Sequence, residues 1–179
     1  MAAQAYQSVP LTAQHNLEQF SCGQAELDTW LREDALHAAA MNTARTFVWV
    51  ETKGVVVGYY SLSAHQLASE GLPSIARGGP RQIPSVLLGK LALDERLQGN
   101  QRKPQTDKRR LGDDLLVDAL GRVLVATQQV AARLVVVDAI DDRAVKFYER
   151  FGFVRTTPDS SRLVRKISDI AAAFDEVDG

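Results

Sequence analysis

The sequence predicts an α+β fold, in which a central mixed and mostly antiparallel β-sheet is flanked by helices. Two runs of β-branched and aromatic residues, 45–51 and 55–62, are separated by a turn of hairpin length and indicate an antiparallel pair. An unbroken apolar run at residues 134–138 is typical of a strand buried on both faces. Segments with helical periodicity precede and separate these runs, so helices and strands follow one another in a mixed order.

A first helix is expected to start after residue 21. Ser21 and Gln24 have the spacing of a capping box, in which two side chains satisfy the free N–H groups of a helix start. Apolar residues then recur at helical spacing. These residues are Leu27, Trp30, Leu31 and Ala35.

The middle of the chain is expected to hold a crossing loop and then a strand. Between about His65 and Pro84, repeated glycines and prolines would interrupt any long element. Residues 86–93 form an apolar run and are predicted to be a strand. Residues 95–110 are polar and charged, and Pro104 interrupts them, so a second loop is expected there.

Two further helices are predicted in the second half of the chain. One begins near Gly112, because two acidic residues follow at the positive end of the helix dipole and an apolar stripe extends to Thr127. The other begins at a cap formed by Asp141 or Asp142 and ends at Gly152, a residue type that terminates helices in a left-handed turn.

Two closing strands, 153–156 and 163–167, are expected on either side of a turn. The whole chain, residues 1–179, has the size of one compact domain. Residues 1–10 and 168–179 are expected to be loosely attached termini, the second of them a docked helix.

Composition excludes several classes of protein. The 21 basic and 22 acidic side chains nearly cancel, which argues against a protein that coats nucleic acid through overall charge. A single cysteine cannot form an internal disulfide, and the three histidines lack metal-ligand spacing, so no metal site is expected. The start of the chain lacks a basic lead and an apolar stretch, and no apolar run approaches the ~18 residues of a membrane helix. A cytoplasmic protein is therefore expected.

Two ordered blocks of sequence resemble the GNAT superfamily of N-acetyltransferases. Residues 91–94, then Gln98 and Gly99, then residues 111–116 resemble the strand, loop and helix that bind acetyl-CoA in that superfamily. Residues 135–139 and 144–153 resemble its second half, and this block is the more specific of the two. The resemblance implies the GNAT fold, with the sheet splayed at the acetyl-CoA site, and acetyl-CoA as the acyl donor.

The amino-terminal part resembles a narrower family, the TacT-type toxins. The segments that carry this resemblance are residues 20–23, 27–31, 44–48 and 59–62, and together with the two blocks they span most of the chain. The resemblance implies transfer of an acetyl group to the amino group of an aminoacyl-tRNA, which blocks translation. It also implies a homodimer and a ribbon-helix-helix antitoxin, through which alone the protein would meet DNA.

The resemblance places a set of residues at the cofactor. The predicted cofactor-binding residues are Leu91, Ala92, Leu93, Gln98, Gly99, Arg109, Arg110, Leu111, Gly112, Asp113, Phe147 and Phe151. A pyrophosphate needs backbone N–H groups at the positive end of a helix, and Gly112 would leave them accessible. The strand at residues 91–93 can offer its backbone to the pantetheine arm if the neighbouring strand diverges.

Tyr148 is the predicted catalytic acid. Attack of an amine on a thioester expels a thiolate, and a phenol with an ordinary pKa near 10 stays protonated at neutral pH and can donate to it. An oxyanion would form as well and needs an N–H donor, which is expected near Leu93. An α-amino group, with a reference pKa of about 7.7 to 8.0, is a better acceptor than lysine at about 10.4. The competing interpretation is that Tyr148 packs its helix onto the sheet.

The cofactor loop departs from the GNAT pattern, because one expected glycine is missing. Residues 98–100 resemble the start of the motif and residues 110–112 its end, with 101–109 inserted; alternatively, residues 109–114 are a degenerate copy. The inserted segment is basic. It would contact cofactor phosphates or the tRNA backbone, or else form a solvated loop.

Two other functions remain open from the sequence. The acceptor could be a small amine or a protein amino terminus instead of charged tRNA. If the interrupted loop prevents acetyl-CoA binding, the chain would be a partner-binding corepressor module without enzymatic activity.

Overall fold

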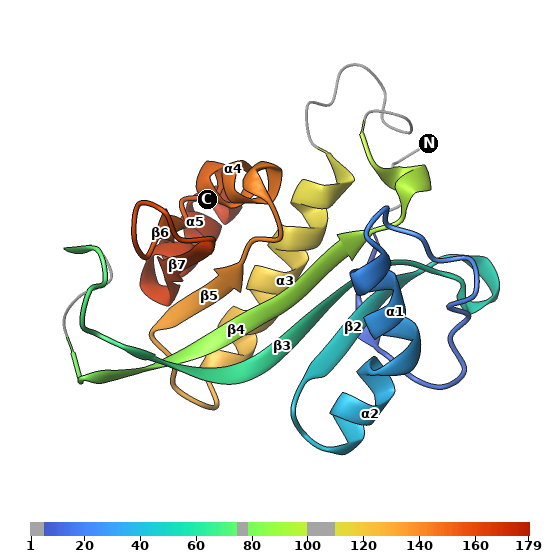
Figure 1. Cartoon of the computed structure of the whole chain (residues 1–179), viewed down its shortest axis with the longest axis horizontal. Coiled ribbons are helices and arrows are strands. Elements are labelled where there is room, and N and C mark those ends of the chain that lie inside the picture. The colour runs from blue at the N-terminus through green and yellow to red at the C-terminus, as the bar shows by residue number, and fades with distance from the viewer. Residues whose placement is uncertain (1–5, 75–78, 100–109) are drawn as a thin grey trace. The chain divides into compact units, whose positions relative to one another are not determined.

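The computed structural model describes residues 6–74, 79–99 and 110–179 (Figure 1). Seven strands are hydrogen-bonded in the order β1-β2-β3-β4-β5-β7-β6. The β4–β5 pair is parallel, whereas β1–β2, β2–β3, β5–β7 and β6–β7 are antiparallel. This arrangement confirms the predicted α+β class and its mixed, mostly antiparallel sheet.

The predicted elements appear in the predicted order, but strand β1 was not predicted and the first helix is divided into α1 and α2. The strands are β1 (Val9–Pro10), β2 (Arg45–Val50), β3 (Val56–Ala68), β4 (Gln82–Leu93), β5 (Leu134–Asp138), β6 (Val154–Arg155) and β7 (Arg162–Lys166). The helices are α1 (Ala25–Glu33), α2 (Ala35–Ala40), α3 (Leu111–Thr127), α4 (Asp142–Arg150) and α5 (Ile167–Asp178), with short 3₁₀ turns η1 (Thr52–Gly54) and η3 (Glu95–Leu97). The chain divides into two compact units, Met1–Leu62 with Lys90–Ala119, and Ser63–Gly89 with Leu120–Gly179.

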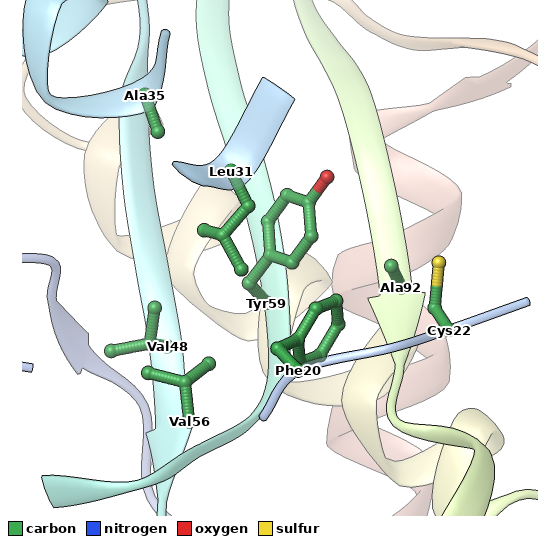
Figure 2. Packing of buried hydrophobic residues seen from close by; sticks show 8 residues of the cluster. All are labelled: Phe20, Cys22, Leu31, Ala35, Val48, Val56, Tyr59 and Ala92. Atoms are coloured by element: carbon green, nitrogen blue, oxygen red, sulfur yellow. The ribbon is translucent and has the colours of Figure 1, made fainter. Parts of the chain in front are cut away.

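The first unit has a core between α1, α2 and one face of its strands. Figure 2 shows Tyr59 of β3 and Ala92 of β4 on the same face as Leu31 of α1. The rings of Phe20 and Tyr59 meet edge to face, with centroids 5.6 Å apart. The fully buried members of this cluster hold α1 against the strands, and burial of each large apolar side chain is favourable by about 1.5–3 kcal/mol.

The second unit has its own apolar cluster, which its strands supply together with Leu72. Leu67 of β3, Ile83 of β4, Val136 of β5 and Val164 of β7 belong to one buried cluster. At the end of the chain, Ile170 of α5 has no exposed surface. The strands β3, β4, β5 and β7 therefore share one apolar layer in this unit.

Two expectations about these elements are wrong. The crossing loop expected between about His65 and Pro84 is too long at both ends, because β3 continues to Ala68 and β4 begins at Gln82, and Leu67 and Ile83 enter the second cluster. Pro84 is tolerated within β4 because the ladder with β5 begins only at the next residue, while the carbonyl of Pro84 accepts a hydrogen bond from the N–H of Arg133.

The capping box expected at α1 does not form. Gln24 occupies the N-cap position without a side-chain cap hydrogen bond, and the hydroxyl of Ser21 donates instead to Glu95. The chain entering α1 is held by Asp28, whose carboxylate accepts a 2.9 Å hydrogen bond from the N–H of Cys22. By contrast, the predicted cap at Asp141 is confirmed, since its side chain accepts from the N–H of Ala144 at 2.8 Å.

Candidate active site

In the first unit, the carboxyl end of β4 carries the predicted pantetheine-binding residues. Ala92 and Leu93 are buried, and Leu91 is half-buried. The parallel ladder between β4 and β5 ends at the pair Leu88 and Val137, five residues before β4 ends at Leu93. The last residues of β4 thus extend beyond that ladder.

The turn after β4 is fixed by Asp94, of which only 1% is exposed. Its carboxylate accepts hydrogen bonds from the N–H of Ser21, the N–H of Arg96 and the guanidinium of Arg96, the shortest at 2.8 Å. Burial alone would raise the pKa of Asp94, but these hydrogen bonds and the positive charge of Arg96 outweigh it and hold the pKa below its usual value. Asp94 is therefore ionised at neutral pH.

Gln98, a predicted cofactor residue, already has partners for its side-chain nitrogen. The amide nitrogen donates to the carbonyl of Leu93 at 2.7 Å and to the carbonyl of Cys22 at 2.8 Å. These bonds tie the loop after η3 to β4 and to the segment before α1. Gly99 follows with a positive φ of 72°, a conformation that favours glycine.

The start of α3 has the open backbone that an anion requires. No described atom would lie within 4 Å of a β-carbon placed on Gly112. Arg110 precedes the helix, its carbonyl accepts from the N–H of Asp113, and its own N–H faces the Asp113 carboxylate at 3.4 Å. Leu111 begins the helix, while Arg109 and the inserted segment 101–109 lie outside the described residues.

In the second unit, α4 buries the side chain of Tyr148, of which 7% is exposed. Its ring meets Phe147 and Phe153 edge to face, with centroids 5.2 Å and 5.5 Å apart. Burial raises the pKa of Tyr148 above its ordinary value, so its hydroxyl stays protonated. In the described part of the chain, no group forms a hydrogen bond with that hydroxyl.

Phe147 and Phe151 extend the aromatic cluster beside Tyr148. Their ring centroids are 5.4 Å apart, and the guanidinium of Arg150 lies 5.6 Å from the first ring and 5.5 Å from the second. The three predicted residues of this helix therefore form one aromatic surface in the second unit.

Sequence reasoning missed a charged cluster at the carboxyl end of β5. Asp138 and Arg162 form two hydrogen bonds of 2.7 Å and 2.8 Å, and His65 lies 3.4 Å from the same guanidinium. The hydrogen bonds from Arg162 lower the pKa of Asp138 despite its partial burial. Nothing in the sequence pairs these residues, because they come from three different strands or strand ends.

A second feature that sequence reasoning missed is Lys90, the one charged residue in the apolar run 86–93. Its ammonium nitrogen lies 4.7 Å from the centroid of the Trp30 ring. A lone cation within an apolar strand was the signal that could have identified it.

Two general properties of the described ranges bear on the type of site. They contain no group of three or more His, Cys, Asp and Glu side chains arranged to hold a metal ion. No helix within them combines the length and the apolar character needed to cross a membrane.

Comparisons with known proteins connect both halves of the chain to one group of enzymes. No family model matches the chain. A tRNA-acetylating toxin of Mycobacterium tuberculosis is 34% identical over 154 residues, which cover 86% of this chain and 87% of that protein.

Solved structures resemble the whole fold. A tyrosine-to-phenylalanine mutant of KacT superposes with a TM-score of 0.84 at 25% identity, over 96% of this chain and 100% of that chain. AtaT, solved in complex with acetyl-methionyl-tRNAfMet, has a TM-score of 0.81 at 25% identity, over 94% of this chain and 99% of that one. AtaTR bound with acetyl-CoA has a TM-score of 0.79 at 26% identity, over 96% and 99% of the two chains.

Proposed function

Because the chain belongs to the family of tRNA-acetylating toxins, which are GNAT-type N-acetyltransferases, we propose that it acetylates aminoacyl-tRNA and thereby blocks translation. The donor is acetyl-CoA, and the acceptor is the amino group of the amino acid esterified to tRNA. Two solved relatives support this assignment, since one contains acetyl-CoA and the other an acetylated methionyl-tRNA.

Tyr148 is the proposed general acid. The acceptor nitrogen forms a bond to the acetyl carbon, the carbon–sulfur bond breaks, and the leaving sulfur takes a proton from the Tyr148 hydroxyl. The acceptor amine starts from a neutral form that is well populated near pH 8. Its nitrogen loses one proton to solvent, and solvent returns a proton to the Tyr148 phenolate, which restores the acid. Tyr148 is protonated at neutral pH and no described group engages its hydroxyl, so its proton is available to the leaving sulfur.

The cofactor contacts are proposed on two elements of the first unit. The backbone at Leu91, Ala92 and Leu93 holds the pantetheine arm in the manner of an added strand. The open backbone at Gly112 and its neighbours at the start of α3 holds the pyrophosphate. Arg110 supplies positive charge beside them, and Phe147 and Phe151 are the proposed contacts from the second unit.

The same proposal includes partners and location. A ribbon-helix-helix antitoxin neutralises the protein and carries it to DNA, and two copies of the chain form a homodimer. The substrate places the protein in the cytoplasm, where charged tRNA is used. We further propose that residues 1–179 act as one domain, because β3, β4 and α3 each run through both compact units.

The observation that carries this proposal is the largely buried ring of Tyr148, whose hydroxyl stays protonated and is engaged by no described group. Its test is transfer of label from acetyl-CoA to a pool of charged tRNAs, with Tyr148→Phe beside the wild type. The variant should lose about 10²- to 10⁴-fold in rate, the usual contribution of a general acid. Tyr6→Phe is the matched control, because that hydroxyl contacts Glu51 at 2.9 Å.

The outcomes separate the alternatives. Acetyl-CoA binding without transfer to any charged tRNA would reject the aminoacyl-tRNA acceptor in favour of another amine. Failure to bind acetyl-CoA would reject the enzyme and favour a partner-binding module. Full activity of Tyr148→Phe would remove Tyr148 from the chemistry.

A further inference from the structure

Lys90 forms a cation–π contact with Trp30 in the first unit. Its ammonium nitrogen lies 4.7 Å from the centroid of the Trp30 ring, and both side chains are half-buried. Trp30 is stacked on Tyr59, with centroids 6.1 Å apart and planes 14° apart, and the Tyr59 hydroxyl donates to the carbonyl of Leu27 at 2.7 Å. The Trp30 ring of α1 is thus held in place by Tyr59 of β3 and has little freedom to move.

The charge of Lys90 is not balanced by an acid within the described ranges. No carboxylate there lies within 4.0 Å of its ammonium group, and no hydrogen bond to it is formed. An ammonium group has three N–H donors, and none of those of Lys90 has a partner among the described residues. The aromatic contact attracts the charge without accepting a conventional hydrogen bond from it. The ammonium group of Lys90 is therefore available to bind an anionic ligand.

The face of β4 on which Lys90 lies separates it from the proposed pyrophosphate site. Side chains alternate along a strand, so Lys90 shares a face with Ala92, which packs with Tyr59 under α1 (Figure 2). Leu93 lies on the other face, where it approaches Gly58 together with Leu115 of α3. Lys90 is therefore on the opposite side of the strand from α3, whose start is the proposed pyrophosphate site.

We propose that Lys90, held on Trp30, binds a phosphodiester of the 3′-terminal nucleotides of the charged tRNA and positions the acceptor. The inference rests on the proposed function, and Lys90 comes directly before the proposed cofactor strand, residues 91–93. The amino acid of the acceptor is esterified to the terminal ribose, so the nearest permanent negative charges belong to the adjoining phosphodiesters. Lys90 acts through binding and takes no part in bond making or breaking.

The test compares Lys90→Met, which keeps the apolar stem and removes the charge, with Lys90→Arg, which restores a cation. KM for charged tRNA should rise about tenfold in Lys90→Met, and the slope of log KM against log salt should fall by about one, as for loss of one phosphate contact. The kcat and the Kd for acetyl-CoA should stay close to wild type, and Lys90→Arg should recover most of the affinity. Lys53→Met is the matched control, because Lys53 is exposed in the turn η1.

A second acceptor tests whether Lys90 contacts phosphate and not another part of the charged tRNA. With an aminoacyl-adenosine that lacks phosphate, Lys90→Met and wild type should have the same KM. A KM difference that persists with this acceptor, or an unchanged KM and salt slope with charged tRNA, would overturn the proposal. A lower melting temperature with an unchanged KM would assign Lys90 to packing alone.

Failure of the proposed enzymatic function can be distinguished from failure of the proposed phosphate contact. If the wild type acetylated no aminoacyl acceptor, retention of charged tRNA on filters would still be measured for the wild type and both variants. Equal salt slopes in that binding measurement would reject the phosphate contact, and a slope reduced only in Lys90→Met would sustain it.

Discussion

The thiol of Cys22 is chemically silent for a physical reason. Burial is the largest cause that raises the pKa of Cys22, to about 12, and the neighbouring Asp28 adds to it. The reactive species of cysteine is the thiolate, which an unfolded chain forms readily above about pH 8.5. The lone cysteine of this chain is accordingly expected to act as a core residue and not as a nucleophile.

Alkylation measures this protection directly. At pH 8 the native thiolate fraction should be about one in ten thousand, so iodoacetamide should label native protein at less than about 1% of the rate for urea-unfolded protein. Because the folded pKa is raised, the stabilisation is complete below the unfolded pKa and declines as the pH rises from about 9 toward 12. Equal labelling of native and unfolded protein would contradict the assignment.

At this scale the sequence is informative only where chemistry is local. The sequence alone could single out Tyr148 as a candidate because the residues around it, 144–153, lie together in one segment. The contact between Lys90 and Trp30 could not be predicted, because it depends on how a strand and a helix pack and no short motif links the two residues. The inserted basic segment stays an open prediction, since it lies outside the described residues.

Asp118 shows how one side chain can secure an element. From α3, its carboxylate accepts hydrogen bonds from the indole of Trp49 at 2.6 Å, the hydroxyl of Ser8 at 2.7 Å and the hydroxyl of Tyr60 at 3.0 Å. These donors come from β2, β3 and the segment before β1. The first half of α3, which carries the proposed pyrophosphate site, is thereby tied to the strands of its own unit.

Asp118→Asn should destabilise the protein by about 2 kcal/mol. An amide has one acceptor oxygen where the carboxylate has two, so at least one donor loses a charge-assisted partner. Urea unfolding measures the loss, and Asp175→Asn on the exposed face of α5 is the control. A change of less than about 0.5 kcal/mol would show that the network adds nothing to stability.

Element boundaries were predictable where local rules coincide with burial. Strand β5 has the predicted bounds, and the start of α4 follows its predicted Asp141 cap. The β3–β4 segment was misjudged, because glycines and prolines disfavour long elements locally while the apolar residues Leu67 and Ile83 favour extension into a core. Burial in the tertiary structure determines where β3 and β4 end and begin, and a short sequence window does not contain that information.

Acid stability depends on the molecule as a whole, and Asp94 and Asp138 show that each unit carries a carboxylate with a depressed pKa. For such groups the stabilisation is present above the unfolded pKa, near 4, and is lost as the pH falls through the folded pKa. The free energy of unfolding should therefore be level from pH 5 to 7 and decline below about pH 4.

Asp94→Asn isolates one of these contributions. The variant should be less stable at pH 7, and the slope of its free energy of unfolding against pH near pH 3 should be shallower by up to ~1.4 kcal/mol per pH unit. Chemical unfolding at a series of pH values gives both quantities, with Asp175→Asn as the control. A slope identical to that of the wild type would mean that Asp94 titrates normally in the folded protein.

Both margins of the sheet end in strands of only two residues, β1 and β6. An edge strand ordinarily exposes a row of unpaired N–H and C=O groups that can recruit a strand from another molecule. Here one margin includes Pro10, which has no N–H to donate, and the other stops after Arg155. Edge-to-edge polymerisation is thus disfavoured at both margins, which should let the chain accumulate in concentrated solution without forming β-aggregates.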